Sequence, residues 1–420
     1  MYNKTVLSNG IRIVTEEMPG VRSVAFGVWI GTGSHYEDAS EAGISHLIEH
    51  LLFKGTQKRT AKEIAEAIES VGGQLNAFTS KEYTCYYARV LDEHLPLAID
   101  VLADMFFSSL FTPEDIEREK RVVQEEIRMY EDSPDEIIHD IFAQTIWDGH
   151  PLGRPVIGTR DSVAALSREK IISFYQKYYR PANLVLALAG NIKHERAVSL
   201  LEPLFAQGTP GEAVEYSTTP PQPRAVFKHF YKPLEQVQLC MGVPALSQKD
   251  ERIYALQILN SLLGGGASSR LFQKIREERA LVYSIYSYYT AFRDTGLFVI
   301  YAATSPDNFD DVLELSWQEI RRIAEDGISP EELTRSKEQI KGSILLASEN
   351  VIHRMHRLGK SDLIYNRLIT TEEILEKVFR VNRTEIQELA QELLDPGRFT
   401  ATVLGNLDVE RISLPWAKEF

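Results

Sequence analysis

The stretch Ala42-Gly43-Ile44-Ser45-His46-Leu47-Ile48-Glu49-His50-Leu51-Leu52-Phe53-Lys54-Gly55 decides how this chain is organised. Its apolar residues recur at helical spacing and Gly55 follows them, which predicts a helix over this stretch. In such a helix, His46 and His50 lie one turn apart on one face, with Cβ atoms about 5–6 Å apart. Two imidazoles at that spacing can bind one zinc ion, and Glu49 lies close enough to act on water at the metal.

A zinc site of this kind needs a third ligand, and a carboxylate from the predicted helix that begins at Pro113 is the best candidate. On that helix Glu119 and Glu126 share one stripe with apolar residues, namely Ile116, Val123 and Tyr130. Acidic residues are seldom buried without a partner, so the stripe predicts two inward-facing carboxylates. Glu125 falls on a neighbouring, more polar stripe. The alternative is an ordinary helix whose acidic residues pair with nearby basic ones, namely Arg118, Lys120 and Arg121.

The composition indicates a globular protein with more than one domain. The chain has 420 residues, 44% of them hydrophobic, and a formal net charge of -14. This charge argues against nucleic acid or an anionic membrane surface as a partner and permits basic peptide substrates. The two cysteines, Cys85 and Cys240, form no disulfide framework or metal knuckle, which fits a reducing compartment. No targeting leader and no membrane-spanning run is recognised, so we expect a soluble, cytoplasmic protein.

Predicted strands and helices alternate along the chain, which indicates an α+β architecture. Residues 207–223 are rich in proline and glycine and lack apolar periodicity, which is typical of a linker. The expected organisation is therefore a first domain over 1–206, a linker over 207–223 and a second domain over 224–420.

The two halves repeat each other. The pairs Arg168 and Arg383, Pro181 and Pro396, and Gly190 and Gly405 each have one offset, since 383−168, 396−181 and 405−190 all equal 215. A constant offset of this kind predicts a duplicated α+β domain.

The second copy keeps the apolar scaffold of the histidine helix and loses its polar set. In the aligned segments, the positions of His46, Glu49 and His50 are taken by Gln257, Asn260 and Ser261, and that of Glu126 by Ser343. Residues that served only packing would not be expected to change together. We therefore expect the first domain to be catalytic and the second to have another role.

The run from Gly43 to Thr56 resembles the active-site segment of the pitrilysin-type (M16) zinc metallopeptidases, whose His-x-x-Glu-His order is termed inverzincin. The resemblance covers essentially the whole chain and is greatest to the short members, akin to the mitochondrial processing peptidase β subunit and its bacterial relatives. It implies two homologous α/β-sandwich domains of the M16 and LuxS-like metallohydrolase type. It also implies one Zn²⁺ per chain, bound by His46, His50 and a glutamate 76 positions after His50, which is Glu126.

The resemblance assigns roles to further residues. It implies that Glu49 is the general base, that Glu119 supports the site without ligating zinc, and that Asn76 and Ala77 lie on an edge strand that pairs with substrate backbone. In the second half, Arg276 and Tyr283 match the arginine and tyrosine that contact substrate near the scissile bond. Both can donate to a carbonyl or a developing oxyanion.

The expected function is zinc-dependent endopeptidase activity on unfolded peptides, and the acidic composition permits basic ones. The resemblance implies a homodimer whose two chains form a clamshell around a chamber, with Arg276 and Tyr283 supplied to each zinc by the partner chain. Three alternatives stay open: a non-catalytic assembly protein of the same family, a catalytic subunit that requires a homologous partner, and a binding module with a structural zinc. The intact set of His46, Glu49, His50 and Glu126 favours the enzyme.

Overall fold

The computed structural model describes residues 2–207, 219–408 and 412–416. The chain forms two compact units, each assembled from separate stretches of sequence. Unit 1 comprises 1–128, 154–217 and 345–369, and unit 2 comprises 129–153, 218–344 and 370–420. Within the described ranges, no helix has the length and apolar character needed to cross a membrane.

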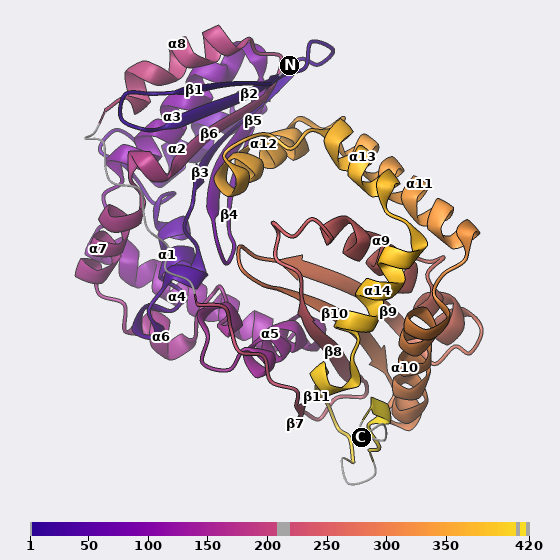
Figure 1. The fold of residues 1–420 in the computed structure, drawn as a ribbon. Helices are drawn as coiled ribbons and strands as arrows, with labels where there is room; N and C mark the ends of the chain where they lie inside the picture. Colours follow the sequence, from indigo (N-terminus) through magenta and orange to yellow (C-terminus); the bar gives the residue numbers. More distant parts are fainter. Residues whose placement is uncertain (1, 208–218, 409–411, 417–420) are drawn as a thin grey trace. The chain divides into compact units, whose positions relative to one another are not determined.

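Unit 1 is built on a six-stranded mixed sheet with the order β1-β2-β6-β3-β5-β4 (Figure 1). The strands are β1 (Tyr2–Val6), β2 (Arg12–Glu17), β3 (Ser23–Ile30), β4 (Gln74–Thr79), β5 (Thr84–Leu91) and β6 (Leu184–Gly190). β2 and β6 run parallel, whereas the other neighbours run antiparallel. β4 is consequently an edge strand, with no strand of the described residues on its outer side.

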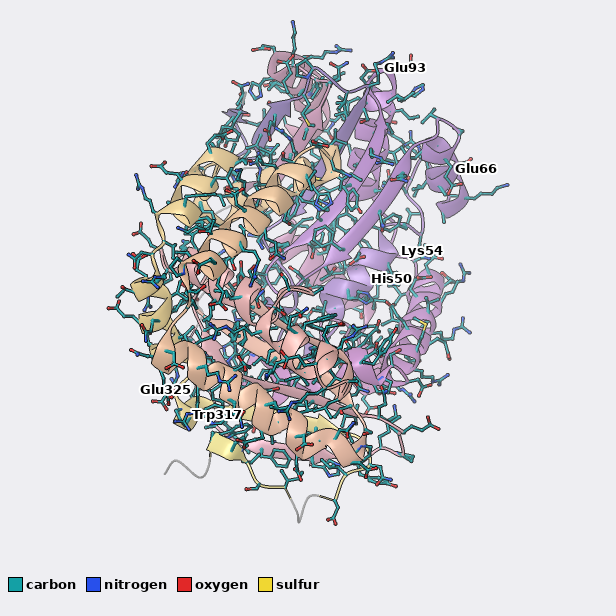
Figure 2. All side chains as sticks on the ribbon, turned by 90° about the vertical axis from the view of Figure 1, so that its right-hand side faces the viewer. His50, Lys54, Glu66, Glu93, Trp317 and Glu325 are labelled. Atoms are coloured by element: carbon teal, nitrogen blue, oxygen red, sulfur yellow. The ribbon has the colours of Figure 1, made fainter. Side chains whose placement is uncertain are left out.

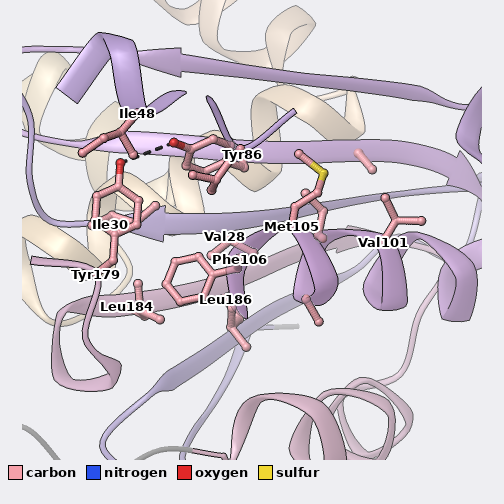
Figure 3. Close-up of a cluster of buried hydrophobic side chains, with 14 of the residues drawn as sticks. Val28, Ile30, Ile48, Tyr86, Val101, Met105, Phe106, Tyr179, Leu184 and Leu186 are labelled. Atoms are coloured by element: carbon pink, nitrogen blue, oxygen red, sulfur yellow. Dashed lines mark hydrogen bonds between the residues drawn. The ribbon is translucent and has the colours of Figure 1, made fainter. Parts of the chain in front are cut away.

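Helices from the first half of the sequence cover one face of this sheet. They are α1 (Ile44–Leu51), α2 (Ala61–Glu69), α3 (Leu95–Ser108), α4 (Pro113–Glu131), α6 (Arg160–Ala164), α7 (Arg168–Tyr178) and α8 (His194–Phe205). Figure 3 shows Ile48 of α1 in the core between helices and sheet, beside the hydrogen-bonded hydroxyls of Tyr86 and Tyr179. These buried contacts hold α1 against the sheet.

The opposite face of the unit 1 sheet is covered by α12 (Val351–Tyr365), a helix from the second half of the sequence (Figure 1). The indole of Trp29 lies under this helix and donates a hydrogen bond to Met355 Sδ (3.3 Å). Gly359 lies against the same indole, where a Cβ atom would come within 2.3 Å of the ring. The close approach of helix and strand therefore requires a glycine at this position.

Unit 2 repeats this plan on a five-stranded sheet with the order β7-β11-β8-β10-β9. Its strands are β7 (Phe227–Phe230), β8 (Val237–Ala245), β9 (Val282–Ala291), β10 (Gly296–Thr304) and β11 (Thr400–Leu404). Its helices include α9 (Ile253–Leu263), α10 (Phe309–Asp326), α11 (Pro330–Ala347), α13 (Thr371–Arg380) and α14 (Arg383–Leu393). α5 (Pro134–Ile146), from the first half of the sequence, packs against β8 and β11.

The predicted α+β architecture with two duplicated domains is confirmed. Strands β2-β6-β3-β5-β4 of unit 1 follow the same order as β7-β11-β8-β10-β9 of unit 2, and the parallel pair β2 and β6 corresponds to the parallel pair β7 and β11. In this correspondence β4 and β9 occupy equivalent edges.

The boundaries of the compact units differ from the linear division of the sequence at 207–223. Residues 129–153, which include α5, belong to unit 2, and residues 345–369, which include α12, belong to unit 1. Each sheet has two apolar faces, and the helices of its own half cover one of them, so a helix from the other half buries the second. Residues 208–218 of the predicted linker lie outside the described residues.

Candidate metal centre and active site

The start of α1 is fixed by a buried acidic side chain. The carboxylate of Glu37 accepts hydrogen bonds from the backbone N–H groups of Gly43 and Ser45, both at 2.8 Å. These groups lie at the helix N-terminus, where a negative charge is stabilised by unpaired N–H groups and the helix dipole. Burial raises the pKa of Glu37 to about 7 in spite of these hydrogen bonds. Gly43 has a φ of 92°, a conformation that favours glycine.

α1 presents its two histidines on the side opposite its buried residues. Leu47 and Ile48 are fully buried, whereas the rings of His46 and His50 lie next to each other with centroids 4.7 Å apart. The helix ends at Leu51, earlier than the predicted end near Gly55. The chain forms a tighter turn there, because the N–H groups of Phe53 and Lys54 bond to the carbonyls three residues back, His50 O (3.2 Å) and Leu51 O (3.1 Å).

The predicted stripe on α4 is present in the structure. Glu119 is buried with 1% exposure, and Glu126 is half-buried, seven residues further along the same face. Glu125 is exposed and forms an ion pair with Arg128 on its own helix. α4 therefore directs two carboxylates toward the histidines, those of Glu119 and Glu126, whereas Glu125 points away from them.

His46, His50 and Glu126 each place one ligand atom in a group whose members all lie within 4.8 Å of one another. His46 Nε2 lies 3.8 Å from Glu126 Oε1, and His50 Nε2 lies 3.6 Å from Glu126 Oε2. Two ligands of one tetrahedral zinc ion are about 3.3–3.5 Å apart, given bonds of about 2.0–2.2 Å. Two imidazoles and one carboxylate are also the donor set of catalytic zinc sites, so these residues fit zinc.

The surroundings of the histidines suit metal binding. The Nδ1 of His50 lies 3.3 Å from Glu119 Oε2, and because a carboxylate accepts, Nδ1 is the donor of this hydrogen bond and Nε2 is the nitrogen that faces the ligand group. Burial, together with the nearby His50, lowers the pKa of His46 to about 4. His46 is thus neutral near pH 7, which is the form that ligates metals.

Glu119 contacts the ligand group through His50, on the ring nitrogen that faces away from Glu126. Its Oε2 also lies 3.0 Å from Lys54 Nζ. Figure 2 shows His50 and Lys54 close to each other at the end of α1. Burial alone would raise the pKa of Glu119, but the hydrogen bonds from His50 and Lys54 outweigh it and the pKa is lowered. Glu119 therefore stays ionised and contacts the His50 ring nitrogen that lies away from Glu126, a position that suits the supporting role implied by the resemblance.

Glu49 lies on the same helix and is held by the edge strand. The hydroxyl of Thr79, the last residue of β4, donates a hydrogen bond to Glu49 Oε2. The pKa of Glu49 is raised, chiefly because the carboxylate is removed from water, and the Thr79 hydrogen bond and the charge of His50 oppose this. A carboxylate with a raised pKa is suited to accepting and returning a proton.

Asn76 and Ala77 lie on the edge strand β4, as predicted. The Ala77 N–H is bonded to the side-chain oxygen of Asn76 (2.8 Å), so an added strand would have to replace this contact. A pocket of about 620 Å³ opens beside this edge, with Phe53 and Leu75 in its lining. Strand edge and pocket together can receive an extended peptide and one of its side chains.

Two family models match the chain: "Insulinase (Peptidase family M16)" at residues 12–160 and "Peptidase M16 inactive domain" at residues 165–340. A Streptomyces coelicolor protein named as an uncharacterized zinc protease is 42% identical over 98% of this chain and 91% of its own length. The uncharacterized zinc protease YmxG of Bacillus subtilis is 42% identical over 94% of this chain and 96% of its own. The chain belongs to the M16 peptidase family.

Two solved structures share the fold of this M16 family member. One is a peptidase M16 inactive domain from Pseudomonas fluorescens, with a TM-score of 0.90 and 20% identity, covering 96% of this chain and 98% of that one. The other is a protease from Helicobacter pylori, with a TM-score of 0.88 and 21% identity, covering 97% and 99%. At these identities the likeness shows the fold alone.

In the second domain of this M16 family member, α9 occupies the position that α1 has in the first domain, but it lacks the histidine side chains. α9 packs on the edge strand β9 as α1 does on β4, and its Leu256 and Leu259 are fully buried. Gln257 and Ser261 hold the positions of the two histidines, and Asn260 holds that of Glu49, as the sequence comparison indicates. The match of residues 165–340 to the inactive-domain model agrees with this loss.

Arg276 and Tyr283 belong to unit 2. Arg276 lies in a π-helical turn (Phe272–Glu277), and its guanidinium stacks over the rings of Phe272 (4.7 Å) and Tyr283 (5.3 Å). Tyr283, at the start of β9, is 76% exposed. The structure therefore brings these two predicted residues together within their own unit.

Three residues of the site were missed by sequence reasoning: Glu37, Lys54 and Thr79. These residues lie in a loop, a turn and a strand end, where the sequence has no periodic pattern that indicates which side chains face the site. Proximity in the sequence to other site residues was the available hint, since Lys54 directly follows the histidine helix and Thr79 follows Asn76 and Ala77 on the same strand.

Proposed function

We propose that this M16 family member is a zinc-dependent endopeptidase that hydrolyses unfolded peptides. The observation that carries the proposal is that His46, His50 and Glu126 converge to within 4.8 Å while Glu49 stands on the same helix as the two histidines. The names of the relatives from Streptomyces coelicolor and Bacillus subtilis, both zinc proteases, support it.

His46, His50 and Glu126 would hold the zinc, and three protein ligands leave one coordination position open. A zinc ion held by these three residues would supply Lewis-acid chemistry, since it would polarise a carbonyl and make water acidic enough to attack near neutral pH. Glu49 accepts the proton of the attacking water as the new C–O bond forms. It then returns that proton to the amide nitrogen as the C–N bond breaks, so that one water is consumed for each peptide bond.

The substrate is a peptide in extended conformation. Pairing with the edge of β4 at Asn76 and Ala77 requires a free strand, which a folded protein does not offer. The formal net charge of -14 favours basic peptides through long-range attraction.

The first test is hydrolysis of an unstructured, basic, quenched-fluorescent peptide before and after metal removal. We expect the purified protein to carry about one zinc per chain and to cleave the peptide. Chelation should reduce the rate at least ~100-fold, because the Lewis acid is lost, and one equivalent of zinc should restore it. A parallel sample with zinc-saturated chelator controls for effects of the chelator itself. A protein that binds zinc and cleaves nothing in a broad peptide library would contradict the proposal and favour a non-catalytic member or one that needs a different partner.

We further propose that two copies of this chain enclose the substrate chamber, with Arg276 and Tyr283 of one copy serving the metal site of the other. The exposure of Tyr283 and its contact with the Arg276 guanidinium support a role in donating to substrate. Mixing Glu49→Gln chains with Arg276→Ala chains should then restore up to about a quarter of wild-type activity, because in a random mixture half of the dimers are mixed and each has one complete site. Each variant alone provides the baseline. A mixture no more active than the sum of its parts would contradict action across the dimer.

A further inference from the structure

We infer that Thr79 is a positioning residue whose hydroxyl holds the Glu49 carboxylate by Oε2 and so leaves Oε1 as the oxygen that handles the proton. The inference rests on the proposed peptidase function and assigns a role to a residue outside the ligand set and the general base. Its basis is a single hydrogen bond, from Thr79 Oγ1 to Glu49 Oε2, between the end of β4 and the face of α1.

Among the described residues, the Thr79 hydroxyl is the one donor that makes a side-chain hydrogen bond to Glu49. A glutamate side chain has three rotatable bonds, so a partly buried carboxylate held at one oxygen has far fewer orientations than one without a donor. Thr79 therefore selects which oxygen faces the metal site.

Thr79 is itself rigidly placed. It pairs with Thr84 at the end of the β4–β5 ladder, and the next residues are held by backbone hydrogen bonds, from Ser34 N–H to Ser80 O (3.1 Å) and from His35 N–H to Lys81 O (2.7 Å). Threonine is also stiff at χ1 because it is branched at Cβ. The hydroxyl is thus presented from a fixed backbone by a side chain with few rotamers.

Alternation along β4 directs Thr79 to the face that carries α1. Leu75 and Ala77 pack on the core below the helices, whereas Phe78 packs with Trp29 on the opposite face. Thr79 lies two and four residues after Ala77 and Leu75, so its side chain points to the same face of the sheet and contacts α1. The strand proposed to pair with substrate backbone is consequently the strand that fixes the base.

The second copy provides an internal comparison. We align the two domains by matching Tyr87 of β5 with Tyr301 of β10. The pairing of each strand with its edge strand then places Tyr289 at the position of Thr79, and Ser287 at that of Ala77. Asn260, which stands in place of Glu49, accepts a hydrogen bond from Ser287 (2.9 Å). The inactive copy thus joins helix and edge strand through a different position, with Ser287, at the position of Ala77, as the donor to Asn260.

The test compares Thr79→Val, which has the same shape without the donor, with Thr79→Ser, which keeps it. We expect Thr79→Val to lower kcat by about 10- to 100-fold with KM within twofold and zinc at one per chain. Thr79→Ser should stay within about threefold of wild type. In a Glu49→Gln background, Thr79→Val should cause no further loss, because the carboxylate it positions is gone. Wild-type kcat in Thr79→Val, or an equal loss in Thr79→Ser, would overturn the inference.

A second measurement separates this inference from the proposed function. In metal-free protein, we compare the changes in melting temperature caused by Thr79→Val, by Glu49→Ala and by both together. The change in the double variant should differ from the sum of the two single changes by about 3 °C or more, because Thr79→Val alone leaves a carboxylate without its donor. Absence of peptide cleavage by the wild type would overturn the proposed function, whereas additive melting shifts would overturn the Thr79 contact whether or not peptides are cleaved.

Discussion

Glu49→Gln lowers kcat by about three orders of magnitude or more and leaves zinc bound, if Glu49 is the proton carrier of this site. Glutamine has the size of glutamate and can still accept from Thr79 through its amide oxygen, but it takes no proton from water. Glu49 is not among the three residues whose ligand atoms converge, so the metal should stay. A factor of 1,000 corresponds to about 4 kcal/mol of transition-state stabilisation.

Glu66→Gln is the matched control for this prediction. Glu66 lies on the exposed side of α2 (Figure 2), where it pairs with Lys62 across one helical turn. Exposed pairs of this kind contribute a few tenths of a kcal/mol, so both kcat and melting temperature should stay close to wild type. Steady-state kinetics and metal analysis on the same preparations provide the measurement. If Glu49→Gln cleaves peptide within tenfold of wild type, another group carries the proton.

Glu126→Gln weakens zinc binding by about 100-fold or more, whereas Glu125→Gln binds zinc as the wild type does. Glu126 Oε1 and Oε2 face His46 and His50 at 3.8 and 3.6 Å, and the substitution replaces an anionic ligand with a neutral one. Loss of an outer-shell partner alone typically costs 10- to 100-fold in metal affinity, so loss of a ligand should cost at least as much. Glu125, one residue earlier, is exposed and bound to Arg128.

The effect of zinc on thermal stability provides a second comparison of these two variants. At a free zinc concentration about 1,000 times the wild-type Kd, zinc adds about 4.1 kcal/mol to the free energy of unfolding, and a 100-fold weaker site would add about 1.4 kcal/mol. We therefore expect the zinc-dependent rise in melting temperature to shrink markedly in Glu126→Gln and to persist in Glu125→Gln. Competition with a chromogenic zinc chelator gives the affinities directly. Normal zinc affinity in Glu126→Gln would show that the third ligand lies elsewhere.

Much of the ligand set follows from local periodicity. The i, i+4 spacing of His46 and His50 places both imidazoles on one face whatever the rest of the chain does, because helix geometry alone determines it. The stripe on α4 likewise distinguished Glu126 from Glu125, since three or four residues separate neighbours on a helix face. The duplication was visible for a similar reason: a constant offset between two halves is a property of the sequence alone.

Contacts between distant segments were beyond this kind of reasoning. Thr79 reaches Glu49 over 30 positions, and nothing local distinguishes its hydroxyl from that of another strand threonine. The exchange of α5 and α12 between the two units could not be foreseen, because both helices show ordinary amphipathic patterns that do not specify which sheet they cover.

The sequence by itself therefore determined which residues share a helix face, namely the two histidines on one helix and the candidate carboxylates Glu119 and Glu126 on another, and the family resemblance chose Glu126 as the ligand. Tertiary structure alone decided what surrounds them: the Glu37 carboxylate at the start of α1, Lys54 beside Glu119, and the Thr79 hydroxyl on Glu49. The physical reason is that backbone hydrogen bonds fix spacing within a helix, whereas the packing of one element against another depends on burial summed over the whole chain.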